Sequence, residues 1–400
     1  MRRLASVLIL VGAQAAYAQP TPALSPLVGA TEVTRIAPAS GFIDDPVATD
    51  DARIAYIVTD GSTKAELHVL TLATNADQTA DVTAASLHPI GLALVGSRAL
   101  VIGQTDDGQQ TAALVEIAGK KPGAIVYKLG PATHVTLVAR DGKQRVAVHK
   151  ELAPTKTAIR EEVALHAIEN GSKLGAGALE IDDQDVSKKL DFHINHWTEG
   201  MTKAVGILGG TWDPKENARL PDTEATYDVV SGKFTEKKKI ADLFEQKKRF
   251  TVLQGMGTES PRGAVKHDFF KTAWDNGSIA LWHDGVARTL EVDQPLASYD
   301  PKSLQGVVAP DGSAWFALKV DPTNPDAVAR KKADPEYFDI FHVGTDTKAT
   351  RRARVLAKGH RFWLGAMAER EADPKGARFW LLDRSNGVER GASALTLYKL

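Results

Sequence analysis

The sequence has 400 residues, 43% of them hydrophobic, with 49 basic and 50 acidic side chains and a formal net charge of −1. This near-balance argues against nucleic acid or an anionic surface as the main partner, because such partners are held by an excess of Lys and Arg. The absence of cysteine excludes disulfides, thiolate metal sites, a cysteine nucleophile and lipidation at a cysteine.

The first 18 residues have the pattern of a secretory signal peptide. Arg2 and Arg3 precede an uncharged apolar run at residues 4–11, and a small-x-small cleavage site follows at residues 16–18. An uncleaved membrane anchor is the alternative, but it needs about 20 apolar residues, more than this run offers. We therefore expect residues 1–18 to be removed, residues 19–30 to form a short linker, and the mature protein to be periplasmic or secreted without a membrane span.

A degenerate repeat runs through the rest of the chain. Each copy has turn residues next to a short β-branched or aromatic run, the pattern of a tight β-hairpin. Clear copies lie at residues 47–58, 94–103, 138–150, 196–208 and 308–320. Further strand-like runs flank each hairpin and complete a four-stranded unit, whose second strands begin near residues 53, 98, 144, 203, 267, 313 and 377. This spacing of about 54 residues is close to that of β-propeller blades.

The last repeat is one strand short, and the missing strand is available at the other end of the chain. Residues 31–37 (TEVTRIA) form a strand-like run ahead of the first repeat. We therefore predict an all-β, seven-bladed β-propeller over residues 31–400, closed by this N-terminal strand, with six or eight blades as alternatives. A pair of β-sandwich domains is the rival fold, but it explains neither the repeat nor the missing strand. The only helix we expect is a turn or two around residues 240–246.

Three hairpins resemble those of a known superfamily. The segment VAPDGSAWFALKV (308–320), and more loosely residues 138–150 and 47–58, is similar to the "SPDG" hairpins of WD40-like propellers of the TolB type. This resemblance implies the fold and a place in the bacterial envelope, but it says nothing decisive about activity. Prolyl-oligopeptidase-type enzymes also have such propellers beside a hydrolase domain. We expect no such domain here, and the sequence has no G-x-S-x-G motif.

Four histidines lie near the starts of predicted innermost strands: His88, His134, His193 and His360. Innermost strands line the central channel of a propeller, so these side chains could converge at one mouth and bind a divalent metal together with Asp45. Their distances from the following turns differ, however, and an odd shift along a strand turns a side chain to the opposite face. The alternative is that each histidine forms hydrogen bonds within its own blade, and we favour that interpretation.

Trp212 differs from the other tryptophans, most of which fall in predicted strands. It opens a polar loop, residues 212–224, where an exposed aromatic ring could contact a protein or a sugar. With no nucleophile motif and no specific metal spacing, the sequence favours a binding module that presents one face to an envelope or extracellular protein or another ligand. A metal-dependent propeller hydrolase or lyase, with its site at the channel mouth, is the alternative function.

Overall fold

The computed structural model describes most of the chain as strands. The described residues are 29–50, 52–140, 143–155, 158–182, 192–197, 201–208, 212–213, 218–219, 223–239, 250–252, 269–273, 278–283, 286–308, 313–320, 337–344, 346–356, 360–367, 378–385 and 391–399. The predicted signal peptide, the predicted helical turn at 240–246 and most of the expected linker lie outside them. The short 3-10 turn η2 (Leu296–Ser298) was not predicted.

The first four antiparallel sheets follow the chain in order. The first sheet consists of β2 (Phe42–Thr49), β3 (Arg53–Thr59), β4 (Ala65–Thr71) and β5 (Ala76–Asp81). The second consists of β6 (Pro89–Val95), β7 (Arg98–Gln104), β8 (Gln110–Glu116) and β9 (Ile125–Ala132). The third consists of β10 (His134–Arg140), β11 (Lys143–Leu152), β12 (Ala158–Ala167) and β13 (Lys173–Asp182). The fourth consists of β14 (Phe192–Trp197), β15 (Lys203–Leu208), β18 (Thr223–Asp228) and β19 (Lys233–Lys239).

The next two sets of four strands form one continuous sheet. One set is β20 (Phe250–Val252), β21 (Phe269–Ala273), β22 (Ser278–His283) and β23 (Val286–Val292). The other is β24 (Tyr299–Val308), β25 (Ala314–Val320), β26 (Tyr337–Val343) and β27 (Lys348–Leu356). A parallel contact joins β23 to β27, with Glu291 opposite Lys348 and Val292 opposite Ala349. This link between two repeats was not predicted.

The last sheet combines the two ends of the chain, as predicted. It consists of β28 (His360–Ala366), β29 (Arg378–Ser385), β30 (Ala394–Lys399) and the N-terminal strand β1 (Thr31–Ile36). Strand β1 pairs antiparallel with β30, from Thr31 opposite Lys399 to Ile36 opposite Leu395. The N-terminal strand therefore supplies the outermost strand that the last repeat lacks.

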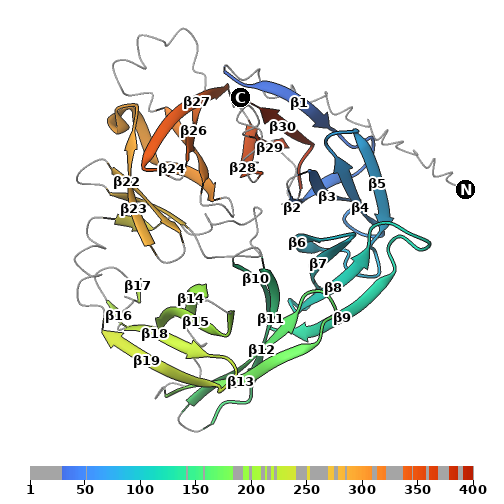
Figure 1. Ribbon diagram of the computed structural model, residues 1–400, viewed down its shortest axis with the longest axis vertical. Helices are drawn as coiled ribbons and strands as arrows, with labels where there is room; N and C mark the ends of the chain where they lie inside the picture. Colours follow the sequence, from blue (N-terminus) through green and yellow to red (C-terminus); the bar gives the residue numbers. More distant parts are fainter. Residues whose placement is uncertain are drawn as a thin grey trace, which may run out of the picture.

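The sheets are arranged around a common centre (Figure 1), with β2, β6, β10 and β28 nearer the centre than β5, β9, β13 and β19. The chain is a β-propeller. The second strand of each set begins within two residues of its predicted start, at Arg53, Arg98, Lys143, Lys203, Phe269, Ala314 and Arg378. The count of seven blades stays a prediction, because residues 240–249, 253–268 and 321–336 lie outside the described part of the chain.

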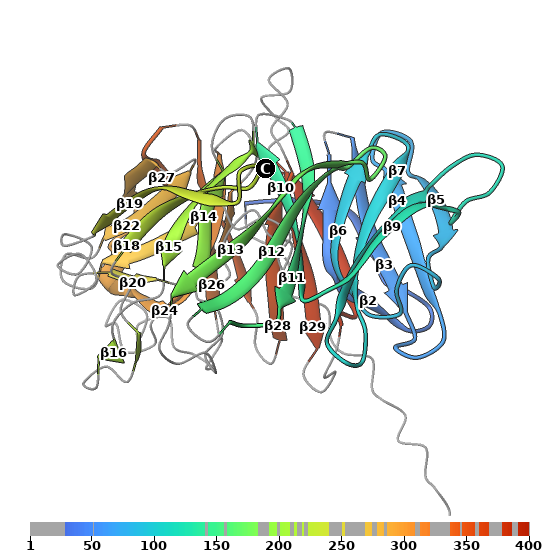
Figure 2. The same ribbon diagram turned by 90° about the horizontal axis from the view of Figure 1, so that it is seen from below.

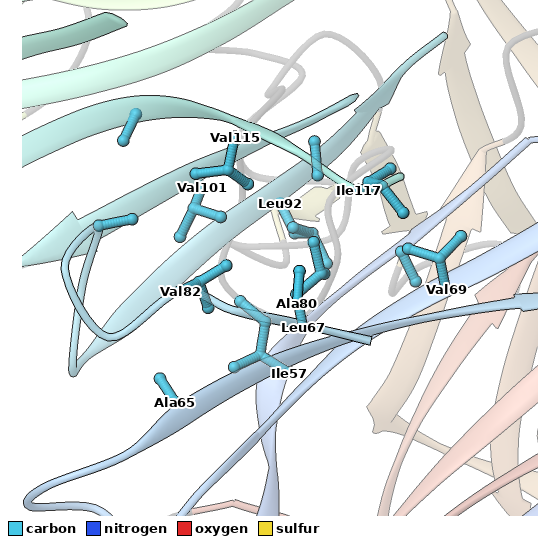
Figure 3. Packing of buried hydrophobic residues seen from close by; sticks show 14 of the residues in the cluster. Ile57, Ala65, Leu67, Val69, Ala80, Val82, Leu92, Val101, Val115 and Ile117 are labelled. Atoms are coloured by element: carbon cyan, nitrogen blue, oxygen red, sulfur yellow. The ribbon is translucent and has the colours of Figure 1, made fainter. Parts of the chain in front are cut away.

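The core lies between neighbouring sheets. One cluster joins the first and second sheets and includes Ile57 and Leu67 from one side and Leu92 and Val101 from the other (Figure 3). Another joins the last sheet to the first, with Leu382 and Leu395 packed against Ile54 and Tyr56. Because each inner strand packs on both faces, residues on both sides of a strand must be apolar to bury area at about 25 cal/mol per Å². A polar side chain on such a strand is therefore either paired with a partner or lies where a junction is open.

Turn chemistry explains where several hairpins reverse. The turn between β12 and β13 contains Asn170 and Gly171, the pair predicted to form it. Gly171 has φ +71°, a left-handed conformation that glycine adopts without strain, and Asn170 Oδ1 accepts a hydrogen bond from the Ser172 N–H at 2.9 Å.

The longer connection at 209–222 contains a feature we did not predict, the short ribbon of β16 (Trp212–Asp213) and β17 (Ala218–Arg219). This ribbon projects below the ring in Figure 2.

Candidate functional site

One face of the propeller carries the candidate functional residues. In each antiparallel set the first, innermost strand starts at the same end as the turn between the second and third strands, since Phe42 lies opposite Thr59 and His134 opposite His149. We call this end of the ring the starting face. It includes the beginnings of β2, β6 and β10 and the turn formed by residues 60–64.

A groove of about 500 Å³ opens on the starting face where the ring is closed. It lies at the point where the chain leaves β1, the outer strand of the last sheet, and crosses to β2, the inner strand of the first. One wall is the crossing segment, residues 36–41. The other wall is the face of β3 and β4 that points toward the last sheet, with Tyr56, Val58, Glu66 and His68. Its volume is in the range of small-ligand and peptide sites.

The groove exists because β4 changes character along its length. Ala65, Leu67 and Val69 point to the second sheet and are fully buried. On the opposite face Leu70 is buried in the junction with the last sheet, whereas His68 and Glu66 follow it toward the turn. Polar side chains therefore replace the apolar ones where the last sheet ends, and the junction stays open there.

Two stacked rings form part of the β3–β4 wall of the groove. The rings of Tyr56 and His68, which are opposite each other in the β3–β4 register, are 4.9 Å apart and inclined by 9°. His68 Nδ1 lies 2.8 Å from Asp77 Oδ2, and His68 Nε2 lies 3.6 Å from Glu66 Oε1. Burial, together with the charge of Asp77, raises the pKa of the Tyr56 hydroxyl above its ordinary value. Tyr56 therefore stays neutral, and the imidazole lies between two carboxylates.

A lysine lies at the mouth of the groove, paired with one carboxylate. Lys64 Nζ is 2.6 Å from Glu66 Oε2. The hydrogen bond and charge of Glu66 raise the pKa of Lys64, and the more distant charges of Asp81 and Asp60 act in the same direction. The Lys64 side chain is 62% exposed and that of Glu66 only 27%, so the carboxylate is the more fixed member of the pair.

Asp60 stabilises the turn formed by residues 60–64. Its carboxylate accepts hydrogen bonds from the backbone N–H groups of Ser62 at 2.9 Å, Thr63 at 2.7 Å and Lys64 at 3.0 Å, and from the Thr63 hydroxyl. The Thr63 hydroxyl and these backbone groups hold the pKa of Asp60 well below its usual range. The turn is thus fixed by Asp60, and it holds Lys64 at the edge of the groove.

The structure places two of the predicted histidines on the starting face but does not bring them together. His88 precedes β6, and its Nε2 lies 3.4 Å from Oδ1 of the exposed Asp106 in the same sheet. His134 is the first residue of β10, and its ring lies 5.7 Å from that of His149 on the neighbouring strand. Within the described residues, no group of three or more His, Asp or Glu side chains is arranged to hold a metal ion.

The remaining predicted site residues are placed only by their backbone. His193 is in β14, His360 is the first residue of β28, Asp45 is in β2 and Trp212 is in β16. Their side chains lie outside the described part of the structure. The proposed metal ring and the proposed Trp212 contact therefore stay predictions.

His149 is a residue that the sequence analysis missed. It is 9% exposed, and its Nδ1 lies 2.5 Å from Glu161 Oε1. Its other ring nitrogen, Nε2, is buried and has no hydrogen-bond partner among the described residues. A carboxylate on one nitrogen fixes the ring orientation and leaves the second nitrogen for another contact.

The groove was missed as well, although the sequence contained a signal. Residues 60–64 have the composition of a tight turn, and Lys64, Glu66 and His68 then alternate with buried apolar residues along β4. Such alternation is typical of a strand with one exposed face, and it is unexpected on a strand that should be packed on both faces.

No family model matches the sequence, and no curated protein is similar to it. Among solved structures, the β-propeller domain of the Trilobed protease from Pyrococcus furiosus is 10% identical, with 90% of this chain and 94% of that one covered and a TM-score of 0.47. The WD40 domain of Toxoplasma gondii coronin is 11% identical, with 94% and 87% covered and a TM-score of 0.39.

Acylaminoacyl peptidase from Pyrococcus horikoshii is 11% identical, with 90% of this chain but only 51% of that chain covered and a TM-score of 0.47.

No described helix has the length and apolar character needed to cross a membrane. The chain has the fold of a β-propeller, and its place among the WD40-like propellers of the TolB type stays a prediction.

Proposed function

We propose that this chain is an exported β-propeller that binds a protein or another ligand on its starting face and catalyses no reaction. The groove at the closing junction is the observation that carries this proposal. It combines a cavity of about 500 Å³, a rigid turn at its edge and polar side chains on an otherwise apolar junction. Binding sites are typically largely preformed concave surfaces with a few fixed polar groups, and this groove has both properties.

Photo-crosslinking from the groove tests the proposal. A genetically encoded lysine analogue with a diazirine group at Ala39, whose flexible aliphatic side chain leaves the groove open, should give one dominant crosslinked product in the native cell. The matched control is the same residue at Ser97, in the exposed β6–β7 turn on the opposite face. Equal products from both positions, or none from Ala39, would contradict a binding function of this face. Cell fractionation and N-terminal sequencing should find the protein exported and starting at Gln19.

The second candidate function is a metal-dependent hydrolase or lyase, and His149 is the observation that favours it. Its buried Nε2 has no hydrogen-bond partner among the described residues, His134 lies beside it, and Glu161 fixes its ring. Under our preferred function, elemental mass spectrometry of protein purified without chelator or nickel should find no stoichiometric metal. About one equivalent of metal that is lost in His149→Ala would favour the second function instead.

A further inference from the structure

The ammonium group of Lys64 occupies the polar end of the groove. This group lies 2.6 Å from Glu66 Oε2, and Asp60 and Asp81 act on it from a longer range. Lys64 extends from a turn and is 62% exposed, so little holds its side chain in this position beyond the ion pair. An exposed ion pair of this kind is weak, and another cation can take the place of the lysine.

The charge around the groove favours a cation over an anion. The four carboxylates near its polar wall are those of Asp60, Glu66, Asp77 and Asp81, whereas Lys64 is the one Lys or Arg among the described residues that line the groove. Asp60 accepts hydrogen bonds from its turn, Asp77 is paired with His68, and Asp81 accepts a hydrogen bond from the Thr83 N–H at 2.9 Å. Glu66 is therefore the carboxylate that faces an incoming group. Clefts lined by one sign of charge concentrate ligands of the opposite sign.

The opposite wall favours an extended chain. The crossing segment runs along the groove through Ala37, Ala39 and Ser40, which are exposed and lie outside any strand. Within the described residues, these three positions make no hydrogen bond to another backbone group. Unpaired backbone groups beside a groove can pair with an extended peptide, while a side-chain pocket supplies the specificity.

We propose that the groove binds an extended segment of a partner protein, and that a Lys or Arg side chain of this segment replaces Lys64 at Glu66. This inference rests on the proposed binding function and names the chemistry of its partner. The peptide backbone runs along residues 37–40, the basic side chain reaches Glu66, and its aliphatic part lies against the Tyr56–His68 stack.

Phage-displayed random hexapeptides are the probe. Full-length mature protein is immobilised, and peptides are selected that bind it but do not bind Ala39→Trp, in which a large ring fills the groove. The selected peptides should contain Lys or Arg at one common position. A synthetic copy of the best peptide, labelled with fluorescein, is then titrated with each variant by fluorescence anisotropy, together with a version that has norleucine at the basic position.

Two variants of the ion pair should act in opposite directions. Glu66→Gln should weaken binding of the basic peptide about tenfold, equivalent to about 1.4 kcal/mol. Lys64→Met should strengthen it about threefold, because the internal competitor is gone and an exposed ion pair is only weakly stabilising. A merely structural role of the pair would weaken binding in both. Glu116→Gln is the matched control, since Glu116 is 28% exposed and pairs with Arg98 at 2.8 Å on the opposite face.

The outcomes separate this inference from the function on which it rests. Peptides that need an open groove but bind equally well with norleucine, or equally well to Glu66→Gln, overturn the basic-segment inference and leave the binding function standing. Absence of any groove-dependent peptide also overturns the inference. The binding function itself fails only if the photo-crosslink from Ala39 is absent or matches that from Ser97.

Discussion

Replacing Asp339 by asparagine should lower the free energy of unfolding by about 3 kcal/mol, the lower end of the cost of breaking a buried ion pair. Asp339 lies on β26 and is 0% exposed. Its carboxylate accepts hydrogen bonds from Arg354 Nε at 2.5 Å, from Arg354 Nη2 at 2.8 Å and from the Tyr299 hydroxyl at 2.8 Å. Asparagine keeps the shape but leaves the guanidinium without its counter-charge. The Arg354 side chain is 23% exposed, so water recovers part of the loss.

The network matters because it joins β24 to β26, two strands that are not neighbours in the sheet. Tyr299 begins β24, Asp339 lies on β26, and Arg354 and Arg351 lie on β27, with Arg351 Nη1 3.3 Å from the carboxylate. Burial raises the pKa of the Tyr299 hydroxyl, and the charge of Asp339 raises it further, so Tyr299 remains a hydrogen-bond donor. Tyr299→Phe should therefore cost about 1 kcal/mol, the net value of one hydrogen bond.

Urea unfolding followed by circular dichroism measures both effects. Asp346→Asn is the matched control, because Asp346 is an exposed acid in the β26–β27 turn of the same sheet. We expect the control to change the free energy of unfolding by less than about 0.5 kcal/mol, as for most surface substitutions. If Asp339→Asn were as mild as this control, the network would not hold the sheet together.

The strands were predictable because their signals are local. The turn pairs and the apolar runs after them lie within about ten residues of each other, and they gave the second-strand starts within two residues. The closing strand was predictable from the number of strands in each repeat, since a last repeat with three strands needs a fourth to match the others. The parallel contact of β23 with β27 was not, because it joins two repeats whose strands meet only in space.

His149 could have been found from register. Arg140 lies opposite Lys143, and counting away from this pair along both strands places His134 opposite His149. Glu161 lies one strand further, close to this pair, because its strand β12 runs beside β11. Comparing histidines between repeats misses this pair, because connections of different length obscure the register there. Pairing within a hairpin is the more reliable guide to side-chain neighbours.

The groove was harder to predict because it depends on two distant segments. Its polar wall comes from residues 56–68, and its other wall exists only because β1 pairs with β30 near the C-terminus. The alternation of Lys64, Glu66 and His68 shows that one face of β4 is polar. It does not show which segment lies opposite, and that information comes from the closure of the ring.

Removing the chain through Gly41 should lower the free energy of unfolding by about 5 kcal/mol. Five residue pairs join β1 to β30, and each backbone hydrogen bond is worth about 1 kcal/mol net. Strand β30, whose Leu395 and Leu397 are buried, becomes an edge strand and is open to pairing with other chains. We therefore expect a lower urea midpoint and larger species in size-exclusion chromatography. A chain that starts at Gly29 keeps β1 and is the matched control.

A peptide of residues 29–41, added in excess to the truncated chain, should restore the urea midpoint, because a strand that binds only the folded ring stabilises it by mass action. It should also restore binding of the groove peptide, since residues 36–41 form one wall of the groove. A truncated chain as stable as its control would contradict closure by β1. Recovery of stability without recovery of binding would instead show that the closing strand stabilises the ring but does not build the site, which separates the two roles of this junction.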